Sequence, residues 1–356
     1  MLGRRQKRAG HIVSKTIRAP TIKDIANAVG VHSSTVSRVM NPATRHMVGD
    51  EVVKRVLRQA AKFRYRPNRM AASLRTNRTH AIGVILPDIT NPVFPPILLG
   101  IEQALSEKGY VPLVANADGE LSHQQYVVDQ MLARRVDGMI FATVTQGDPL
   151  LEQCRQDGVP IVTVNRIDVR GMVPGMVPGV ASDNLLGMEL TVAHLFELGH
   201  RQIAHITGPH NVSTGMLRKK GFVKAMRSRQ LEPMVIAGKS YTREAGRLAC
   251  RELLRRFPKI TAIAAGNDLV AIGCYDALAE AGKRCPDDVS VVGHNDMPLA
   301  DVLSPPLTTI RIAHHEMGAQ AAKMLMEYID GQTVKPVQLM LQPQLIVRRS
   351  TAKPRK

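Results

Sequence analysis

The hydrophobic pattern changes character near residue 80. Before that point, apolar residues recur at helical spacing in short segments that follow Thr21, Ser33 and Asp50. After it, apolar runs of strand length alternate with amphipathic segments of helical length. The runs predict strands at 81–86, 110–115, 137–142, 160–164, 202–207, 260–265 and 289–293. The amphipathic segments predict helices at about 92–108, 122–135, 148–157, 184–198, 214–230, 242–256, 268–282 and 311–330.

Alternation of strands and helices indicates βαβ units and a parallel sheet. It extends over roughly 270 residues, which is long for one sheet and suits two doubly wound lobes side by side. We therefore expect an α/β protein with two parallel-sheet lobes, preceded by a small all-α head. Ligands of such sheets bind beyond the carboxyl ends of the strands, and a cleft between two lobes is a favoured place.

The all-α head has the local signals of a helix-turn-helix. Thr21 and Asp24 have the spacing of a capping box, and the helix that they begin stops at Gly30. A second short helix is expected at Ser33–Met40 and a third at about Asp50–Phe63. Two short helices joined by a glycine-containing turn form the motif, and the third closes its small core.

The positive charge of the chain is concentrated in this first part. The formal net charge is +18, and residues 1–80 hold 18 of the 48 Lys and Arg but three acids, which gives them +15. The other residues hold 30 basic and 27 acidic side chains, or +3. A basic head on a near-neutral body is typical of a protein that binds a polyanion, the alternative being a merely solvated basic surface.

Composition argues against several classes. Hydrophobic residues make up 44% of the chain, but no apolar run is long enough to span a membrane. Residues 1–20 are basic without the apolar core of a secretory signal, and an organellar leader is the alternative explanation of that composition. The four cysteines form no CxxC pair, so we expect no disulfide framework, no metal site and a reducing cytoplasm.

Sequence fragments that resemble enzyme motifs are incomplete. Pro233 stands where a P-loop ending in Ala237–Ser240 requires glycine. Ala319 stands where a zinc-protease helix beginning at His315 requires its second histidine. Ser213 lacks the first glycine of a nucleophile elbow, and no dinucleotide fingerprint follows a predicted strand. We therefore expect neither enzymatic activity nor a cofactor.

Motifs spread along the chain occur in a characteristic order. They are Thr21–Ala26, Thr35–Val39, Tyr65–Asn68, Gly208-Pro209, Arg218–Phe222, Asn267-Asp268, Val292–Asp296 and Pro306–Ile310. Over about residues 21–346 this ordered set resembles the LacI/GalR family of bacterial repressors. The resemblance implies a basic disordered tail (1–20), a helix-turn-helix (21–65), a hinge helix and linker (66–80), a two-lobed effector-binding and dimerisation domain like periplasmic binding proteins (81–346) and a second basic tail (347–356).

The resemblance also assigns contacts with operator DNA. Bases in the major groove would be read by Ser33, Ser34 and Arg38. The DNA backbone would be contacted by Thr21, Ser37 and Asn41. Capping of the second helix is the alternative role for Ser33, because His32 replaces the serine that usually caps it in the family. The loop Pro42–Met47 is about two residues longer than in the family.

In the family the segment after the head forms a hinge helix in the minor groove. The residues placed there would be Asn68, Ala71 and Leu74, with Leu74 inserted at the central base step. An ordinary flexible linker is the alternative. Palindromic operators imply a homodimer. The resemblance also implies a protein of the bacterial cytoplasm, located on the nucleoid when bound to DNA and without a membrane partner.

For the effector cleft the resemblance points to residues at strand ends. They are Asp88, Asn91, Val93, Phe94, Arg218, Asn267, Asp268 and Asn295. Such side chains suit a small sugar, and Asn295, where many members have aspartate, favours a sugar acid. Helix capping is the alternative for Asp268, and Arg166 and Asp183 are either ligand residues or parts of the crossover between lobes.

The resemblance thus implies a sequence-specific repressor whose operator affinity is set by a sugar or sugar-acid effector, acting as inducer or corepressor. A sugar-transport receptor and an enzyme with a DNA-binding head are the rival classes. The repeated Gly171–Pro174 and Gly175–Pro178 are expected to form a surface insertion.

Overall fold

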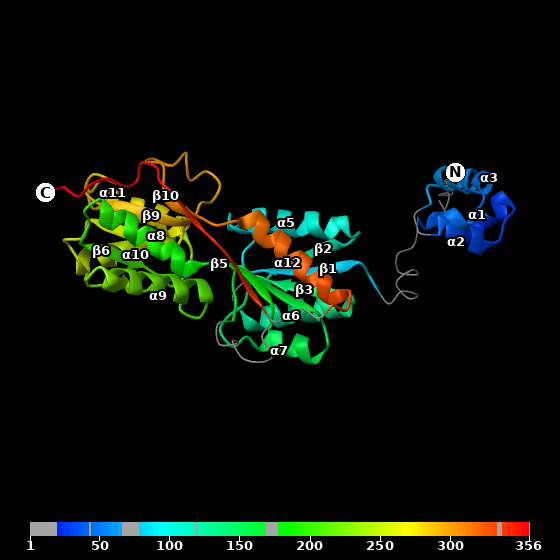
Figure 1. Ribbon diagram of the computed structural model, residues 1–356, viewed down its shortest axis with the longest axis horizontal. Helices are drawn as coiled ribbons and strands as arrows, with labels where there is room; N and C mark the ends of the chain where they lie inside the picture. The colour runs from blue at the N-terminus through cyan, green and yellow to red at the C-terminus, as the bar shows by residue number, and fades with distance from the viewer. Residues whose placement is uncertain are drawn as a thin grey trace, which may run out of the picture. The chain divides into compact units, whose positions relative to one another are not determined.

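The computed structural model of the protein describes residues 20–42, 44–65, 78–117, 120–168, 177–332 and 337–355 (Figure 1). The chain forms two compact units that divide between Asn77 and Arg78. No helix in the described part of the chain combines the length and the apolarity that are needed to cross a lipid bilayer.

The first unit is a small helical head. It contains helices α1 (Ile22–Val29), α2 (Ser33–Met40) and α3 (Asp50–Lys62), with a 3₁₀ turn η1 (Arg45–Met47) between the last two. The predicted helices are thus confirmed, α3 ending one residue early.

Local chemistry fixes the first helix of the head. The Thr21 N–H donates to an Asp24 carboxylate oxygen (2.7 Å) and the Asp24 N–H donates to the Thr21 hydroxyl (3.4 Å), which confirms the capping box. Gly30 ends α1 with φ at 71°, a conformation that glycine adopts without strain. Ile25, Val36 and Val56 are fully buried where the three helices meet.

The second unit begins with a parallel-sheet lobe. Its strand order is β11-β5-β4-β3-β1-β2 and every pairing is parallel. The strands are β1 (Ala81–Leu86), β2 (Val111–Asn116), β3 (Gly138–Phe141), β4 (Ile161–Val164), β5 (Gly179–Ser182) and β11 (Gln338–Leu341). The helices of this lobe are α5 (Phe94–Glu107), α6 (Leu121–Ala133), α7 (Pro149–Gln156) and α12 (His314–Ile329).

A second lobe repeats this architecture, with strand order β12-β10-β9-β8-β6-β7. The strands are β6 (Ile203–Ile206), β7 (Met234–Ile236), β8 (Ala262–Ala265), β9 (Ser290–Asn295), β10 (Thr308–Arg311) and β12 (Gln344–Ile346), of which β12 pairs antiparallel. The helices are α8 (Asn184–Glu197), α9 (Ser213–Ser228), α10 (Arg243–Arg256) and α11 (Asp268–Glu280). The chain passes between the lobes at residues 182–184, 311–314 and 341–344 (Figure 1).

The predicted fold class is confirmed, but several elements were not expected. The sequence pattern missed β5, β7, β10, β11 and β12, which are three or four residues long. The helix expected at 311–330 begins at His314, because Thr308–Arg311 forms β10. Residues 171–176 of the repeat lie outside the described residues.

The end of the chain, expected as a basic tail, packs on the second lobe. Ser350 is fully buried, and its hydroxyl donates to the Val291 carbonyl (2.6 Å) and accepts from the Thr308 N–H (2.8 Å). Arg348 pairs with Asp296 at 2.7 Å. Residues 348–350 therefore cover one side of β9 and β10.

Glycines let α5 and α12 approach closely. A Cβ at Gly100 would lie 2.0 Å from the His315 carbonyl oxygen, and one at Gly318 would lie 2.0 Å from the Ile97 carbonyl oxygen. Both contacts are with backbone, which a side-chain rotation cannot relieve.

Gly318→Ala is therefore expected to destabilise the second unit by about 1–3 kcal/mol, although alanine favours a helix by up to about 1 kcal/mol. Urea unfolding followed by circular dichroism measures the change. Ser106→Ala, at an exposed position of α5, is the matched control and should unfold like the wild type. Equal stability of Gly318→Ala and the control would show that the helices can separate without cost.

Candidate functional sites: a nucleic-acid-binding head and a ligand cleft

Helix α2 presents its polar side chains to solvent. Ser34 and Arg38 are exposed, whereas Ser33 and Ser37 are half-buried. His32 caps the helix, because the Ser34 N–H donates to its Nδ1 (3.3 Å) and the Ser34 hydroxyl lies 2.8 Å from the same atom. The alternative capping role of Ser33 is thus filled by His32, and the Ser34 hydroxyl has a partner within its own helix.

The loop after α2 is tied to the carboxyl end of that helix. The Thr44 hydroxyl donates to the Arg38 carbonyl (3.0 Å), and the Arg45 Nε donates to the Val39 carbonyl (2.8 Å). Cations near a helix carboxyl terminus are favourable, so Arg45 stabilises α2 where it ends. These contacts hold Thr44 and Arg45 against the end of α2.

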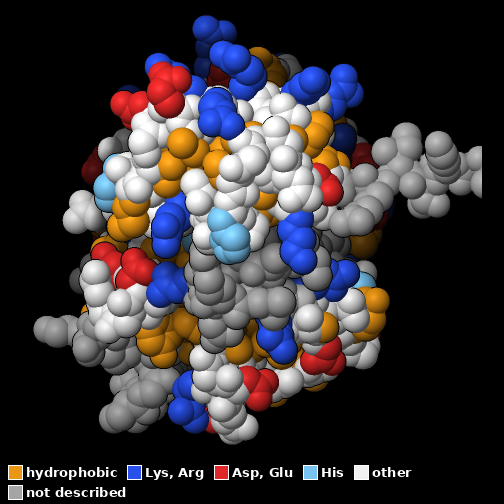
Figure 2. Space-filling view, turned by 90° about the vertical axis from the view of Figure 1, so that its right-hand side faces the viewer, with side chains coloured by type: hydrophobic (Ala, Val, Ile, Leu, Met, Phe, Trp, Pro, Cys, Tyr) orange, Lys and Arg blue, Asp and Glu red, His pale blue; other side chains and the backbone are white. Residues whose placement is uncertain are grey.

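Thr21 and Asn41, assigned to the DNA backbone, lie at helix ends of the head. Thr21 is half-buried and its hydroxyl donates to Asp24 (2.7 Å), while Asn41 is the C-cap of α2. Asn68, Ala71 and Leu74 lie outside the described residues. On the face of the molecule shown in Figure 2, Lys and Arg side chains are more widespread than Asp and Glu.

The second unit has a polar cleft where strand ends from both lobes meet. Most of its lining follows β1, β4, β7 and β8, ends β9 or starts α9. The lining residues are Asn91, Val93, Phe94, Asn165, Arg166, Thr214, Arg218, Tyr241, Asn267 and Asn295. The cleft leaves a free volume of about 20 Å³ in this structure, which holds about one water molecule and is far below the range for ligand pockets. A ligand therefore requires the lobes to separate from this closed arrangement.

Arg218 is buried in this cleft with neutral partners. Its side chain is 2% exposed, and its Nε donates to the Asn184 amide oxygen (2.8 Å). Its two terminal nitrogens donate to the Gly266 carbonyl (2.6 Å) and the Asn295 amide oxygen (3.2 Å). The Tyr241 ring centroid lies 5.7 Å from the guanidinium carbon, so an aromatic face borders the cation.

Adjacent residues at the start of α11 have different roles. Asn267 lines the cleft and caps the helix, because its side-chain oxygen accepts from the Val270 N–H (2.8 Å). Asp268 accepts from the Thr309 hydroxyl (2.5 Å) and the Met297 N–H (2.7 Å) and lies outside the cleft lining. The alternative that Asp268 caps α11 is therefore wrong. Burial raises the pKa of Asp268 to about 6.

The cleft does not include every residue expected there. Asp88 accepts from the Thr90 N–H (2.9 Å) and hydroxyl (2.6 Å) in the turn after β1, outside the lining. Asp183 caps α8 at a crossing between lobes, where it accepts from the Leu186 N–H (2.9 Å). Arg166, expected either as a ligand residue or as part of the crossover between lobes, lines the cleft.

Asn165, Thr214 and Tyr241 were not expected in the cleft. Tyr241 follows β7, whose three residues are too short to stand out in the hydrophobic pattern. Asn165 directly follows the predicted strand at 160–164. Its position at a strand end is the sequence feature that could have assigned it to the cleft. Thr214 is one turn before Arg218 on α9, and its hydroxyl accepts from the Tyr241 hydroxyl (3.2 Å).

Family comparisons agree with this architecture. Residues 21–68 match the family of bacterial regulatory proteins of the lacI type, and residues 192–351 match the periplasmic binding protein-like domain. The chain is 33% identical to the HTH-type transcriptional regulator CelR of Thermobifida fusca, over 94% of this chain and 98% of CelR. It is 31% identical to the ribose operon repressor of Escherichia coli K12, over 93% and 99% of the two chains.

Solved structures show the same similarity. The Lac repressor dimer bound to operator and an anti-inducer superposes with a TM-score of 0.85, at 28% identity over 94% of this chain and all of the other. A CelR–cellobiose complex superposes with a TM-score of 0.72, at 31% identity over 93% and 99% of the two chains.

A helix-turn-helix head followed by two parallel-sheet lobes defines a class of DNA-binding transcription regulators. The chain belongs to the LacI family of that class. It is therefore a regulator rather than an enzyme.

Histidines from both lobes lie near Arg218. His205 and His294 are fully buried, and His314 is half-buried at the start of α12. Burial lowers the pKa of His205 and of His314 to about 4, and it lowers that of His294 well below its ordinary value. Folded protein therefore keeps these rings neutral where the unfolded chain protonates them.

Acidification from about pH 7 to about pH 5 is accordingly expected to lower the free energy of unfolding. The unfolded chain protonates each histidine below about pH 6.5, so each contributes a loss of up to about 1.4 kcal/mol per pH unit. Asp268 opposes this change below pH 6, because the folded chain protonates it first. Urea unfolding at pH 7, 6 and 5 measures the sum, and stability that rises on acidification would contradict it.

Proposed function

We propose that the protein is a repressor that binds palindromic operator DNA as a homodimer. A small carbohydrate effector bound in the cleft raises or lowers its affinity for that DNA. The observation that carries the proposal is the buried Arg218 in the lining of the cleft, in a chain whose other unit exposes Arg38 on α2. A relative bound to cellobiose and a Lac repressor dimer bound to operator support it.

The proposed DNA contacts keep the roles that the family pattern assigns. Arg38 and Ser34 face solvent on α2 and read base edges, with Ser33 beside them. Thr21, Ser37 and Asn41 contact the backbone. Asn68, Ala71 and Leu74 would enter the minor groove after the head. The protein would act in the bacterial cytoplasm, on the nucleoid.

The proposed effector site is the part of the cleft around Arg218. Its amide groups, from Asn91, Asn267 and Asn295, both donate and accept hydrogen bonds, as sugar hydroxyls require. Phe94 and Tyr241 offer ring faces to the apolar face of a sugar. The effector changes operator affinity only by its different affinity for the DNA-competent and incompetent states, typically worth about 1–3 kcal/mol.

Arg38→Ala is expected to reduce the preference for the palindrome over scrambled DNA by about 1–3 kcal/mol, because a guanidinium can bind both acceptors of a guanine. Fluorescence anisotropy with the DNA upstream of its own gene, at two salt concentrations, measures this preference. Arg58→Ala, also at an exposed arginine but on α3, is the control and should keep it. Equal affinity of the wild-type protein for palindrome and scrambled DNA would refute the proposed function.

Arg218→Lys is expected to abolish stabilisation by the effector while operator binding persists, because lysine keeps the charge but loses the forked geometry. A thermal-shift screen with sugars and sugar acids measures the response, since a ligand that binds folded protein raises the melting temperature. Tyr241→Ala, which leaves the buried arginine in place, tests the same site if the lysine variant folds poorly. An unchanged response in both variants would move the effector elsewhere.

A further inference from the structure

Two arginines approach the cleft from different lobes. Arg166 follows β4 of the first lobe, and Arg218 lies on α9 of the second. Burial lowers the pKa of both arginines, and the charge of Arg218 lowers that of Arg166 further, whereas Tyr241 and Asp268 partly offset the effect on Arg218. The cleft thus concentrates positive charge in a place largely sheltered from water.

Protein carboxylates do not balance this charge within the cleft. No Asp or Glu lines it in the described part of the chain. Asp268 is engaged by a hydroxyl and a backbone N–H, and Asp296 pairs at 2.7 Å with arginines outside the cleft lining. Asp88 is engaged in its own turn by Thr90. These three acids therefore have partners of their own.

Arg166 has no hydrogen-bond or ion-pair partner for its side chain among the described residues, although it is half-buried. Arg218 has partners, but they are amide and peptide oxygens without formal charge. Removing cations from water without an opposite charge costs free energy. A ligand that brings a negative charge offsets this cost, whereas a neutral sugar does not.

We propose that the effector is an acidic monosaccharide whose carboxylate or phosphate binds between Arg166 and Arg218. A forked guanidinium matches the oxygens of either group through paired, charge-assisted hydrogen bonds. The remaining hydroxyls face the amides of Asn91 and Asn267. This inference rests on the proposed function, because it names the chemistry of the effector that the same cleft takes.

The test compares acids with their neutral parents on the full-length protein. Gluconate, galactonate and xylonate are matched with glucose, galactose and xylose, and glucose 6-phosphate and ribose 5-phosphate form the phosphate arm. Thermal shift identifies a binding acid and calorimetry gives its affinity. At least one acid is expected to raise the melting temperature where its neutral parent does not, and the arm that responds identifies the anionic group.

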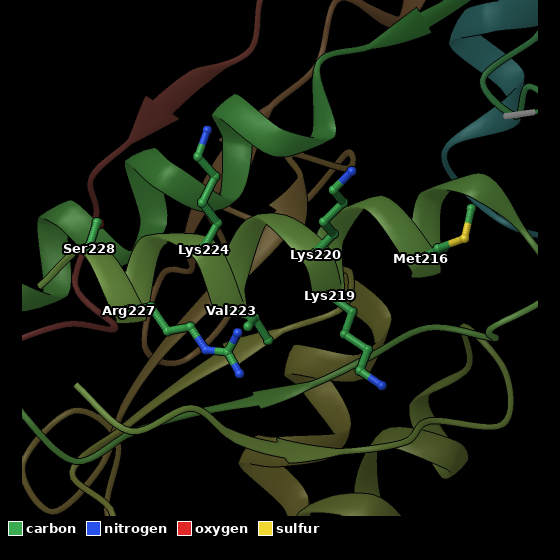
Figure 3. A pocket seen from close by; sticks show the side chains of 7 residues that line it. All are labelled: Met216, Lys219, Lys220, Val223, Lys224, Arg227 and Ser228. Carbon is green, nitrogen blue, oxygen red and sulfur yellow. The ribbon is translucent and has the colours of Figure 1, made fainter. Parts of the chain in front are cut away.

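Arg166→Gln should then weaken binding of that acid by about tenfold or more, and Arg166→Lys by less, because lysine keeps the charge. Without ligand, Arg166→Gln should melt no lower than the wild type, because it removes an uncompensated cation. Arg227→Gln is the matched control. Figure 3 shows Arg227 in a groove on α9 that shares no residue with the cleft lining, and this variant should bind the acid like the wild type.

Several results would overturn the inference. They are a neutral sugar that stabilises the protein more than its acid, no shift with any acid of the panel, acid affinity in Arg166→Gln equal to that of the wild type, and a lower melting temperature of that variant without ligand. Specific operator binding by the wild-type protein, measured in parallel, separates these failures from failure of the proposed function.

Discussion

A buried guanidinium needs oxygen partners on every side, and Arg218 takes them from separate elements of the second lobe. Asn184 begins α8, Gly266 follows β8 and Asn295 ends β9, and each supplies an oxygen to one guanidinium nitrogen. Leaving such a group unpaired would cost several kcal/mol. The cation therefore holds these strand ends in register and gives the cleft its charge.

The path of the chain makes this cleft a natural place for control. The chain crosses between the lobes at 182–184, 311–314 and 341–344, and both lobes supply residues to the cleft lining. A ligand bound there contacts both lobes, so it favours the arrangement in which both sets of contacts form. The hydrogen-bond partners of Arg218 are uncharged, so that arrangement is sensitive to a single opposite charge brought into the cleft.

Local patterns predict much of this protein, and long-range contacts account for what they miss. Thr21, Asp24 and Gly30 define α1 through bonds that span a few residues, so the sequence alone specifies that helix. Strand–helix alternation likewise predicts two lobes. It does not predict β11 or β12, because Gln338 and Gln344 interrupt the apolar runs. Each strand forms only by pairing with an earlier strand, β11 with β5 and β12 with β10.

The cleft shows the same division between local and tertiary information. Family motifs bring Arg218, Asn267 and Asn295 together, but they do not separate the helix cap at Asn267 from the buried Asp268, since either residue type can cap. Arg166 follows a predicted strand, yet only packing between the lobes turns it toward Arg218.

The central claim is that occupancy of the cleft and operator binding are thermodynamically coupled. The most direct measurement is the operator affinity with and without a saturating cleft ligand, together with the ligand affinity with and without operator. The account predicts that both affinities change by the same factor, about 5- to 150-fold. Operator affinity that does not change when the cleft is full would contradict it.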